Sequence, residues 1–257
     1  MINTYDYTFY TLIVEGKYLF EIPNYQRHYV WTEKEIKLFL NDGYFCMGKY
    51  LGRDEKFEHY AGQMIFRKLR EEKDGRSVLE IIDGQQRLTT FMLLIMAVME
   101  QLGMEKSGSQ EIEELRKKYL LSCSGIHTCE CEKKLKLSQR DSSFWESMFA
   151  GTVPRKEDGM LESQLCLLKA REIIIGYLEK ITKEMNSAER ESTLMKFVDA
   201  LANSFRIVML MSEKGGQEFA LFQIVNDRGV PLTAGELLKA RTIELLTSQK
   251  KEERRDR

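Results

Sequence analysis

A chain of 257 residues, 43% of them hydrophobic, is long enough to bury a core, as one large domain or as a compact domain with a helical insertion. Charged residues make up 31% of the chain but nearly cancel to a formal net charge of -1, which excludes a general basic field for nucleic acid, so any contact with DNA must be local. The most apolar stretch, residues 91–99, falls well short of the roughly 20 residues of a membrane-spanning helix, which excludes such a span.

Composition also favours a helix-rich protein of a reducing compartment. The chain has only three prolines, among many Lys, Glu, Leu and Met residues. Its five cysteines are odd in number, and the N-terminus lacks the basic and apolar runs of a signal peptide. We therefore expect a soluble, cytoplasmic protein with reduced thiols.

The first elements in chain order are a strand, a loop and a helix. Residues 18–22 are strand-like, and Pro23 halts them, so that residues 23–31 form an irregular loop. Thr32 and Glu35 fit a capping box, which starts a helix at about residue 33. A loop near Asn41-Asp42-Gly43 is expected to follow that helix.

Next come a hairpin, a long helix and a helical region. Two strand-like runs, residues 59–69 and 77–82, flank a charged turn and predict the hairpin. Apolar residues at helical spacing between Leu88 and Leu102 predict a helix capped by Gly103. Beyond it, the patterns predict helices at residues 111–121, 161–179 and 191–202, a strand at 205–211, and helices at 217–225 and from 233 to about 248.

The strongest candidate for chemistry is Asp83-Gly84-Gln85-Gln86-Arg87, between a buried strand and the long helix. A helix start offers free N–H groups to phosphate, and glycine lets the backbone approach closely. Arg87 can grip phosphate oxygens bidentately, the glutamines can read a base or ribose, and Asp83 can hold Mg²⁺, orient a water or cap the helix. The alternative is that Asp83 is only a cap and that the glutamines face solvent.

Two further segments carry polar groups that local spacing alone does not assign. The loop at residues 22–31 interleaves aromatics with Gln26 and Arg27, so it either stacks on a base or packs its aromatics under the first helix, as we expect of Tyr29 and Trp31. In the third segment, residues 219–233, Asn226 and Arg228 either join a pocket or lie in a simple turn between two helices.

Taken together in this order, the three segments resemble signature blocks of the N-terminal domain family of GmrSD-type, modification-dependent restriction endonucleases. The blocks are Pro-Asn-Tyr-Gln-Arg at 23–27, Asp-Gly-Gln-Gln-Arg-Leu-Thr-Thr at 83–90 and Asn-Asp-Arg-Gly-Val-Pro-Leu-Thr at 226–233. The match extends over nearly the whole chain, and the central block is the most specific.

The resemblance implies an α+β fold with a small mixed-sheet core of the ParB/sulfiredoxin-like kind and a large helical subdomain. Residues 1–103 would form the core, residues 104–204 the helical subdomain, and residues 205–257 a strand and helices that return to the core. It also implies binding and hydrolysis of a nucleoside triphosphate with Mg²⁺. The catalytic candidates are Asp83, Gln86 and Arg87, and the nucleotide-binding candidates are Gln26, Arg27, Gly84, Gln85, Arg87, Asn226 and Arg228.

Such domains are joined to an HNH-type nuclease, in the same chain or as a partner, that cuts phage DNA with modified bases or backbone. This chain has only three histidines, far apart, so we expect neither an HNH metal site nor DNA cleavage by this chain alone. No Walker loop is present either.

Three other patterns have plain explanations. Cys123, His127, Cys129 and Cys131 could hold zinc, but their short spacing favours reduced thiols in a loop. The basic run at 133–140 could touch DNA phosphates but is more typical of a solvated face. The methionines at positions 92, 96 and 99 favour an adaptable core rather than a partner groove.

The leading hypothesis is therefore a nucleotide-binding and hydrolysing regulatory domain of an antiphage restriction system, controlling an HNH-type nuclease. Modified phage DNA and a second copy of the chain are further expected partners, and a membrane is not. The rivals are a non-enzymatic recognition module for modified DNA and direct nuclease action by this fold.

Overall fold

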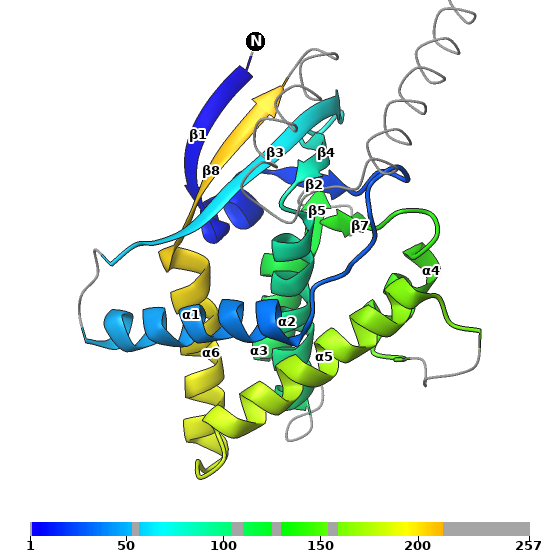
Figure 1. Cartoon of the computed structure of the whole chain (residues 1–257). Helices are drawn as coiled ribbons and strands as arrows, with labels where there is room; N and C mark the ends of the chain where they lie inside the picture. Colours follow the sequence, from blue (N-terminus) through cyan, green and yellow to red (C-terminus); the bar gives the residue numbers. More distant parts are fainter. Residues whose placement is uncertain (1, 53–56, 104–109, 125–129, 154–158, 213–257) are drawn as a thin grey trace, which may run out of the picture.

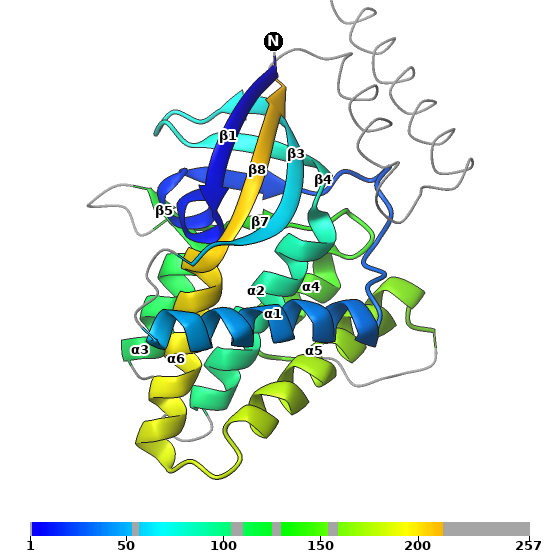
Figure 2. The same cartoon turned by 60° about the vertical axis from the view of Figure 1, so that its left-hand side comes forward.

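The computed structural model describes residues 2–52, 57–103, 110–124, 130–153 and 159–212. A sheet forms one layer and the longer helices lie against it as another, as Figure 1 and Figure 2 show from two sides. The six-stranded sheet has the order β1 (Ile2–Thr8), β8 (Phe205–Ser212), β3 (His59–Glu71), β4 (Ser77–Asp83), β2 (Tyr18–Glu21) and β7 (Leu135–Lys136). The longer helices are α1 (Glu33–Leu51), α2 (Gln85–Gly103), α5 (Glu162–Ile181) and α6 (Ser187–Ser204). The shorter described elements are η1 (Thr11–Glu15), α3 (Gln110–Leu115), η2 (Arg116–Leu120), β5 (Leu121–Ser124), β6 (Glu130–Lys133) and α4 (Ser142–Phe149).

Strand direction varies across the sheet. Strand β2 runs parallel to both β4 and β7, and β3 runs parallel to β8, while β4 is antiparallel to β3 and β1 is antiparallel to β8. This mixed sheet with its helices confirms the predicted α+β class and is consistent with a ParB-like core. One apolar cluster takes residues from the predicted core and from the predicted helical subdomain, and the division at residues 103 and 204 stays a prediction.

Several predicted elements are confirmed. The hairpin is β3–β4, the long apolar helix is α2, and the helical patterns after residue 110 correspond to α3 with η2, to α5 and to α6. The strand predicted at 205–211 is β8. The helices predicted after residue 212 lie outside the described residues. Within the described part of the chain, no helix combines the length and the apolar character needed to cross a membrane.

Helix α1 begins as predicted but does not end as predicted. The Thr32 backbone N–H donates to Glu35 Oε2 over 2.8 Å, as in a capping box. The helix then continues through Asn41-Asp42-Gly43 to Leu51, so the loop expected there was wrong. A Cβ atom on Gly43 would lie 2.8 Å from Leu201 Cδ1 of α6. The glycine therefore allows two helices to approach each other and does not end the helix.

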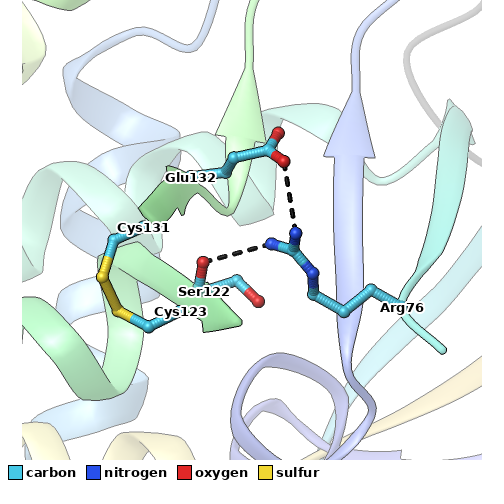
Figure 3. Close-up of a disulfide and its surroundings, with 5 residues drawn as sticks. All are labelled: Arg76, Ser122, Cys123, Cys131 and Glu132. Carbon is cyan, nitrogen blue, oxygen red and sulfur yellow. Dashed lines mark hydrogen bonds and ion pairs between the residues drawn. A yellow bond between two sulfur atoms is a disulfide. The ribbon is translucent and has the colours of Figure 1, made fainter. Parts of the chain in front are cut away.

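The cysteines of the β5–β6 hairpin also correct an expectation. Cys123 and Cys131 stand opposite each other in the antiparallel register and form a disulfide, so they are not the reduced thiols that were predicted (Figure 3). Arg76 lies directly before β4 and binds this hairpin, since it donates to the Ser122 carbonyl at 3.1 Å and to Glu132 at 3.2 Å. Antiparallel pairing brings together two cysteines whose spacing alone showed no bond.

Candidate functional site

The three neighbouring parallel strands β4, β2 and β7 have their carboxyl ends on the same side of the sheet. Strand β4 ends at Asp83 and leads into α2, β2 leads into the loop at residues 23–31, and β7 leads into residues 137–141. The Ile22 N–H donates to the Lys136 carbonyl at 2.9 Å, which holds two of these exits side by side. Ligands of open α/β sheets bind beyond such carboxyl ends.

The turn between β4 and α2 requires its glycine. Gly84 has a φ of 94°, and a Cβ atom there would lie 2.6 Å from Met64 Cγ. The first helical hydrogen bond of α2 runs from the Leu88 N–H to the Gly84 carbonyl over 3.1 Å. Gly84, rather than Asp83, therefore stands at the cap position of α2.

Both glutamines of the motif are buried and bind the neighbouring loop. Gln85 Nε2 donates to the Arg27 carbonyl at 2.7 Å, and Gln86 Nε2 donates to the His28 carbonyl at 2.9 Å. Gln86 Oε1 accepts from the Val30 N–H at 2.9 Å. Both Nε2 and Oε1 of Gln86 thus have hydrogen-bond partners, and neither glutamine faces solvent.

Arg87 is directed at strand β3. Its guanidinium donates to the carbonyls of Ala61 at 2.5 Å and Gln63 at 2.6 Å. Asp83 Oδ2 lies 3.7 Å from Arg87 Nη2, and burial lowers the arginine pKa against the opposing effect of Asp83. The pairing of β3 with β8 shifts register between Tyr60 and Gln63, so Arg87 holds the irregular part of β3 in place.

The loop after β2 is anchored by its aromatic and amide side chains. Gln26 Nε2 donates to the Ile82 carbonyl at 2.6 Å, and Tyr29 forms a buried 2.8 Å hydrogen bond with Thr90. Burial raises the pKa of Tyr29. Trp31 packs on Phe39 of α1, with ring centroids 6.0 Å apart, which confirms the expected packing of Trp31 under the first helix. Tyr29 is buried as well, but its hydrogen bond joins it to α2.

Two neighbouring cavities, which share lining residues, lie beside these strand ends. The outer cavity has a volume of about 350 Å³ and is lined by Asn24, Gln26, His28, Ser138, Gln139 and Arg140. The inner one has a volume of about 10 Å³, room for about one water, and Gln85, Gln86 and Asp141 are among its lining residues. His28 and Ser138 line both cavities. Gln85 Oε1 is buried and has no hydrogen-bond partner among the described atoms.

The sequence did not identify the segment after β7 as part of the site. Arg140 was grouped with the basic run at 133–140 as a solvated face. A usable signal was the Gln-Arg pair at 139–140, which repeats the pairs at 26–27 and 86–87 and likewise follows a parallel strand. Asp141 was missed as well; it is buried and accepts a 2.6 Å hydrogen bond from Ser163.

Lys134 corrects the expectation of a solvated basic run. Its side chain is buried, and its Nζ donates to the carbonyls of Ile13 at 2.7 Å and Lys118 at 2.6 Å. Burial lowers its pKa to about 8. This lysine is therefore not placed to touch DNA.

A nucleotide fits this donor set better than a protein-held metal ion does. Within the described ranges, no three His, Cys, Asp or Glu side chains gather as metal ligands. Asp83 supplies one partly exposed carboxylate, and Mg²⁺ bound to a triphosphate needs only one or two. The unpaired Gln85 Oε1 suits a hydroxyl or amino donor of a nucleoside. Asn226 and Arg228, the last two predicted binding residues, lie outside the described residues, as do His127 and Cys129.

The family model described as "GmrSD restriction endonuclease, N-terminal domain" matches residues 9–243, which include all three sequence blocks. No curated protein matches the chain.

Proposed function

We propose a function from the premise that this chain belongs to the GmrSD restriction endonuclease N-terminal domain family and is part of a restriction endonuclease system. In this proposal the chain binds and hydrolyses a nucleoside triphosphate. Nucleotide occupancy then biases a two-state element that licenses or restrains an HNH-type nuclease acting on modified phage DNA.

The observation that carries the proposal is the buried, unpaired Oε1 of Gln85 beside the cavity at the three strand ends. A buried carbonyl oxygen without a donor costs about 1–3 kcal/mol, so a ligand that supplies the donor gains that free energy on binding. A ribose hydroxyl or a base amino group is such a donor. The adjacent polar cavity leaves room for the phosphates.

The residues then divide into contacting and positioning groups. Gln26, Arg27, Gly84 and Gln85 would contact the nucleotide, joined by Asn226 and Arg228 of the third block. Gln86 and Arg87 act through the loop and the strand that they hold, because their polar atoms already bind backbone groups. Bound Mg²⁺ would neutralise phosphate charge next to Asp83.

Asp83 is the proposed general base. A water oxygen forms the new bond to the γ-phosphorus while the bond between that phosphorus and the β–γ bridging oxygen breaks, and the water proton passes to the Asp83 carboxylate. The products are a nucleoside diphosphate and phosphate. Asp83 lines neither cavity, but it lies two residues before Gln85 of the inner cavity and is partly exposed at the end of β4, where a water can reach it.

The test measures nucleotide binding by calorimetry and phosphate release for the whole chain with each of ATP, GTP, CTP and UTP and Mg²⁺. We expect one or more triphosphates to bind, and Asp83→Asn to lower phosphate release at least 100-fold while the Kd changes little. Asp6→Asn, an exposed position on β1, is the matched control and should leave both unchanged. The proposal fails if no triphosphate binds, and binding of modified DNA alone would then favour a recognition module.

A further inference from the structure

We propose that the outer cavity is the phosphate subsite of this chain and that Arg140 is its principal cation. The inference rests on the proposed function and extends it, since it assigns the triphosphate to a segment outside the three sequence blocks. Residues 138–140 support this assignment, because they line the cavity together with residues of the loop after β2.

The segment that carries Arg140 is held firmly. The Gln139 N–H donates to Asn24 Oδ1 at 2.9 Å, which joins the two walls of the cavity. The Asp141 N–H donates to the Ser138 carbonyl at 2.9 Å, and the Asp141 carboxylate accepts from the buried Ser163 hydroxyl. A pre-ordered binding segment loses less conformational entropy when a ligand arrives.

The lining of the cavity suits an anion. It offers the guanidinium of Arg140, the imidazole of His28, the Ser138 hydroxyl and the side-chain amides of the remaining lining residues, and it includes no carboxylate. Arg140 is exposed and has no ion-pair partner within the described ranges. A guanidinium fork binds phosphate oxygens bidentately, and amides and hydroxyls can donate to the rest.

The geometry also favours a free nucleotide over a DNA backbone as the source of the phosphate. The volume of about 350 Å³ is near the low end of the roughly 300–1,000 Å³ that small-molecule sites have. His28 and Ser138 line both this cavity and the inner one, whose lining includes Gln85 with its unpaired Oε1. A nucleotide supplies phosphates to the outer cavity and a hydroxyl or amino group to the inner one.

The experiment compares Arg140→Gln with the wild-type chain by calorimetry, using the tightest-binding triphosphate and its parent nucleoside. We expect Arg140→Gln to raise the Kd of the triphosphate at least tenfold and to change the Kd of the nucleoside less than twofold. Arg140→Lys should give an intermediate Kd, because it keeps the charge and loses the fork. Arg70→Gln removes the same charge from the β3 end of the hairpin turn and should change neither Kd more than twofold.

Two results overturn the inference: an Arg140→Gln triphosphate Kd within twofold of wild type, or an equal loss of nucleoside affinity. If the wild type binds no triphosphate nucleotide, the proposed function has failed, and the subsite is then tested with inorganic tripolyphosphate and with a fluorescent DNA oligonucleotide. Arg140-dependent tripolyphosphate binding upholds the subsite. Arg140 dependence for DNA alone, or for neither probe, overturns it.

Discussion

Arg87 shows how a residue of a predicted binding motif can act on the fold. Its two carbonyl contacts flank Gly62, which has a φ of 99° in strand β3. A Cβ atom on Gly62 would lie 2.3 Å from Arg87 Nη1. The glycine and the arginine therefore form one unit, in which the missing side chain makes room for the guanidinium.

The first prediction concerns this unit. Arg87→Ala leaves two carbonyls without their charged donor, and Gly62→Ala displaces the guanidinium, so each should lower the free energy of unfolding by about 2–4 kcal/mol. Because both changes break the same contacts, the double variant should lose less than the sum of the two. Urea unfolding of the four chains measures this.

Gly75→Ala is the control for backbone conformation. Gly75 also has a positive φ, 81°, but a Cβ atom there meets nothing within 4 Å. It should cost only about 1 kcal/mol. Two results would show that Gly62 and Arg87 do not act together. One is an equal loss of unfolding free energy in Gly62→Ala and Gly75→Ala, and the other is strictly additive losses in the variant that combines Gly62→Ala with Arg87→Ala.

Lys134 gives a pH prediction. Its pKa falls from 10.5 in the unfolded chain to about 8 in the folded protein because it is buried. Between these values the unfolded chain binds the extra proton, so the contribution of Lys134 to stability increases as pH rises above 8. Relative to Lys134→Met, the wild type should gain about 2 kcal/mol between pH 7.5 and 9.5.

Urea unfolding of both chains across this range measures the difference in slope. The constant offset caused by the two carbonyls that lose their donor cancels from the slope. Parallel curves for the two chains would show that Lys134 keeps its ordinary pKa.

At the scale of the element, local signals predicted where helices and strands begin better than where they end. The Thr32–Glu35 box placed the start of α1, because its hydrogen bonds lie within four residues. Gly43 was misinterpreted as part of a turn. A glycine is needed there because of the close contact with Leu201, which is far away in the sequence. The short β7 was not predicted, since its partner β2 supplies the pairing.

Helix α1 contains a second glycine, which makes the next prediction a matched comparison. A Cβ atom on Gly48 meets nothing within 4 Å, so Gly48→Ala should raise the free energy of unfolding by about 0.5–1 kcal/mol through helix propensity. Gly43→Ala gains the same propensity but pushes against buried Leu201, and it should be at least about 1 kcal/mol less stable than Gly48→Ala.

Denaturant unfolding of the two variants, with the slopes checked for equality, decides this comparison. Equal stabilisation by both alanines would mean that α1 and α6 can move apart without cost. Gly43 would then have no packing role.

At the scale of the whole molecule, the sequence predicted the blocks of the proposed site but not how the fold brings them together. The blocks at 23–27 and 83–90 were recognisable because their polar residues form compact patterns. Arg140 was not, because its position depends on β7 joining β2 at the edge of the sheet. Likewise, no local sequence pattern indicated that the side chains of Gln86 and Arg87 would form hydrogen bonds with backbone groups.

The proposed site is formed where three strands end. Because the intact fold brings these segments together, one ligand should affect all of them at once. A bound triphosphate should slow amide hydrogen exchange at the same time in residues 24–30, 83–90 and 138–142, because it ties together loops that otherwise open independently. Strand β1 lies at the opposite edge of the sheet and should exchange at an unchanged rate.

Exchange measured by mass spectrometry with and without the nucleotide tests this pattern, and Arg140→Gln is the informative variant. In that variant, protection of residues 138–142 should fall even at a nucleotide concentration that saturates the site, while residues 83–90 keep theirs. Protection limited to a single segment in the wild type would show that the three exits do not share one ligand. The sheet edge would then position loops for separate tasks.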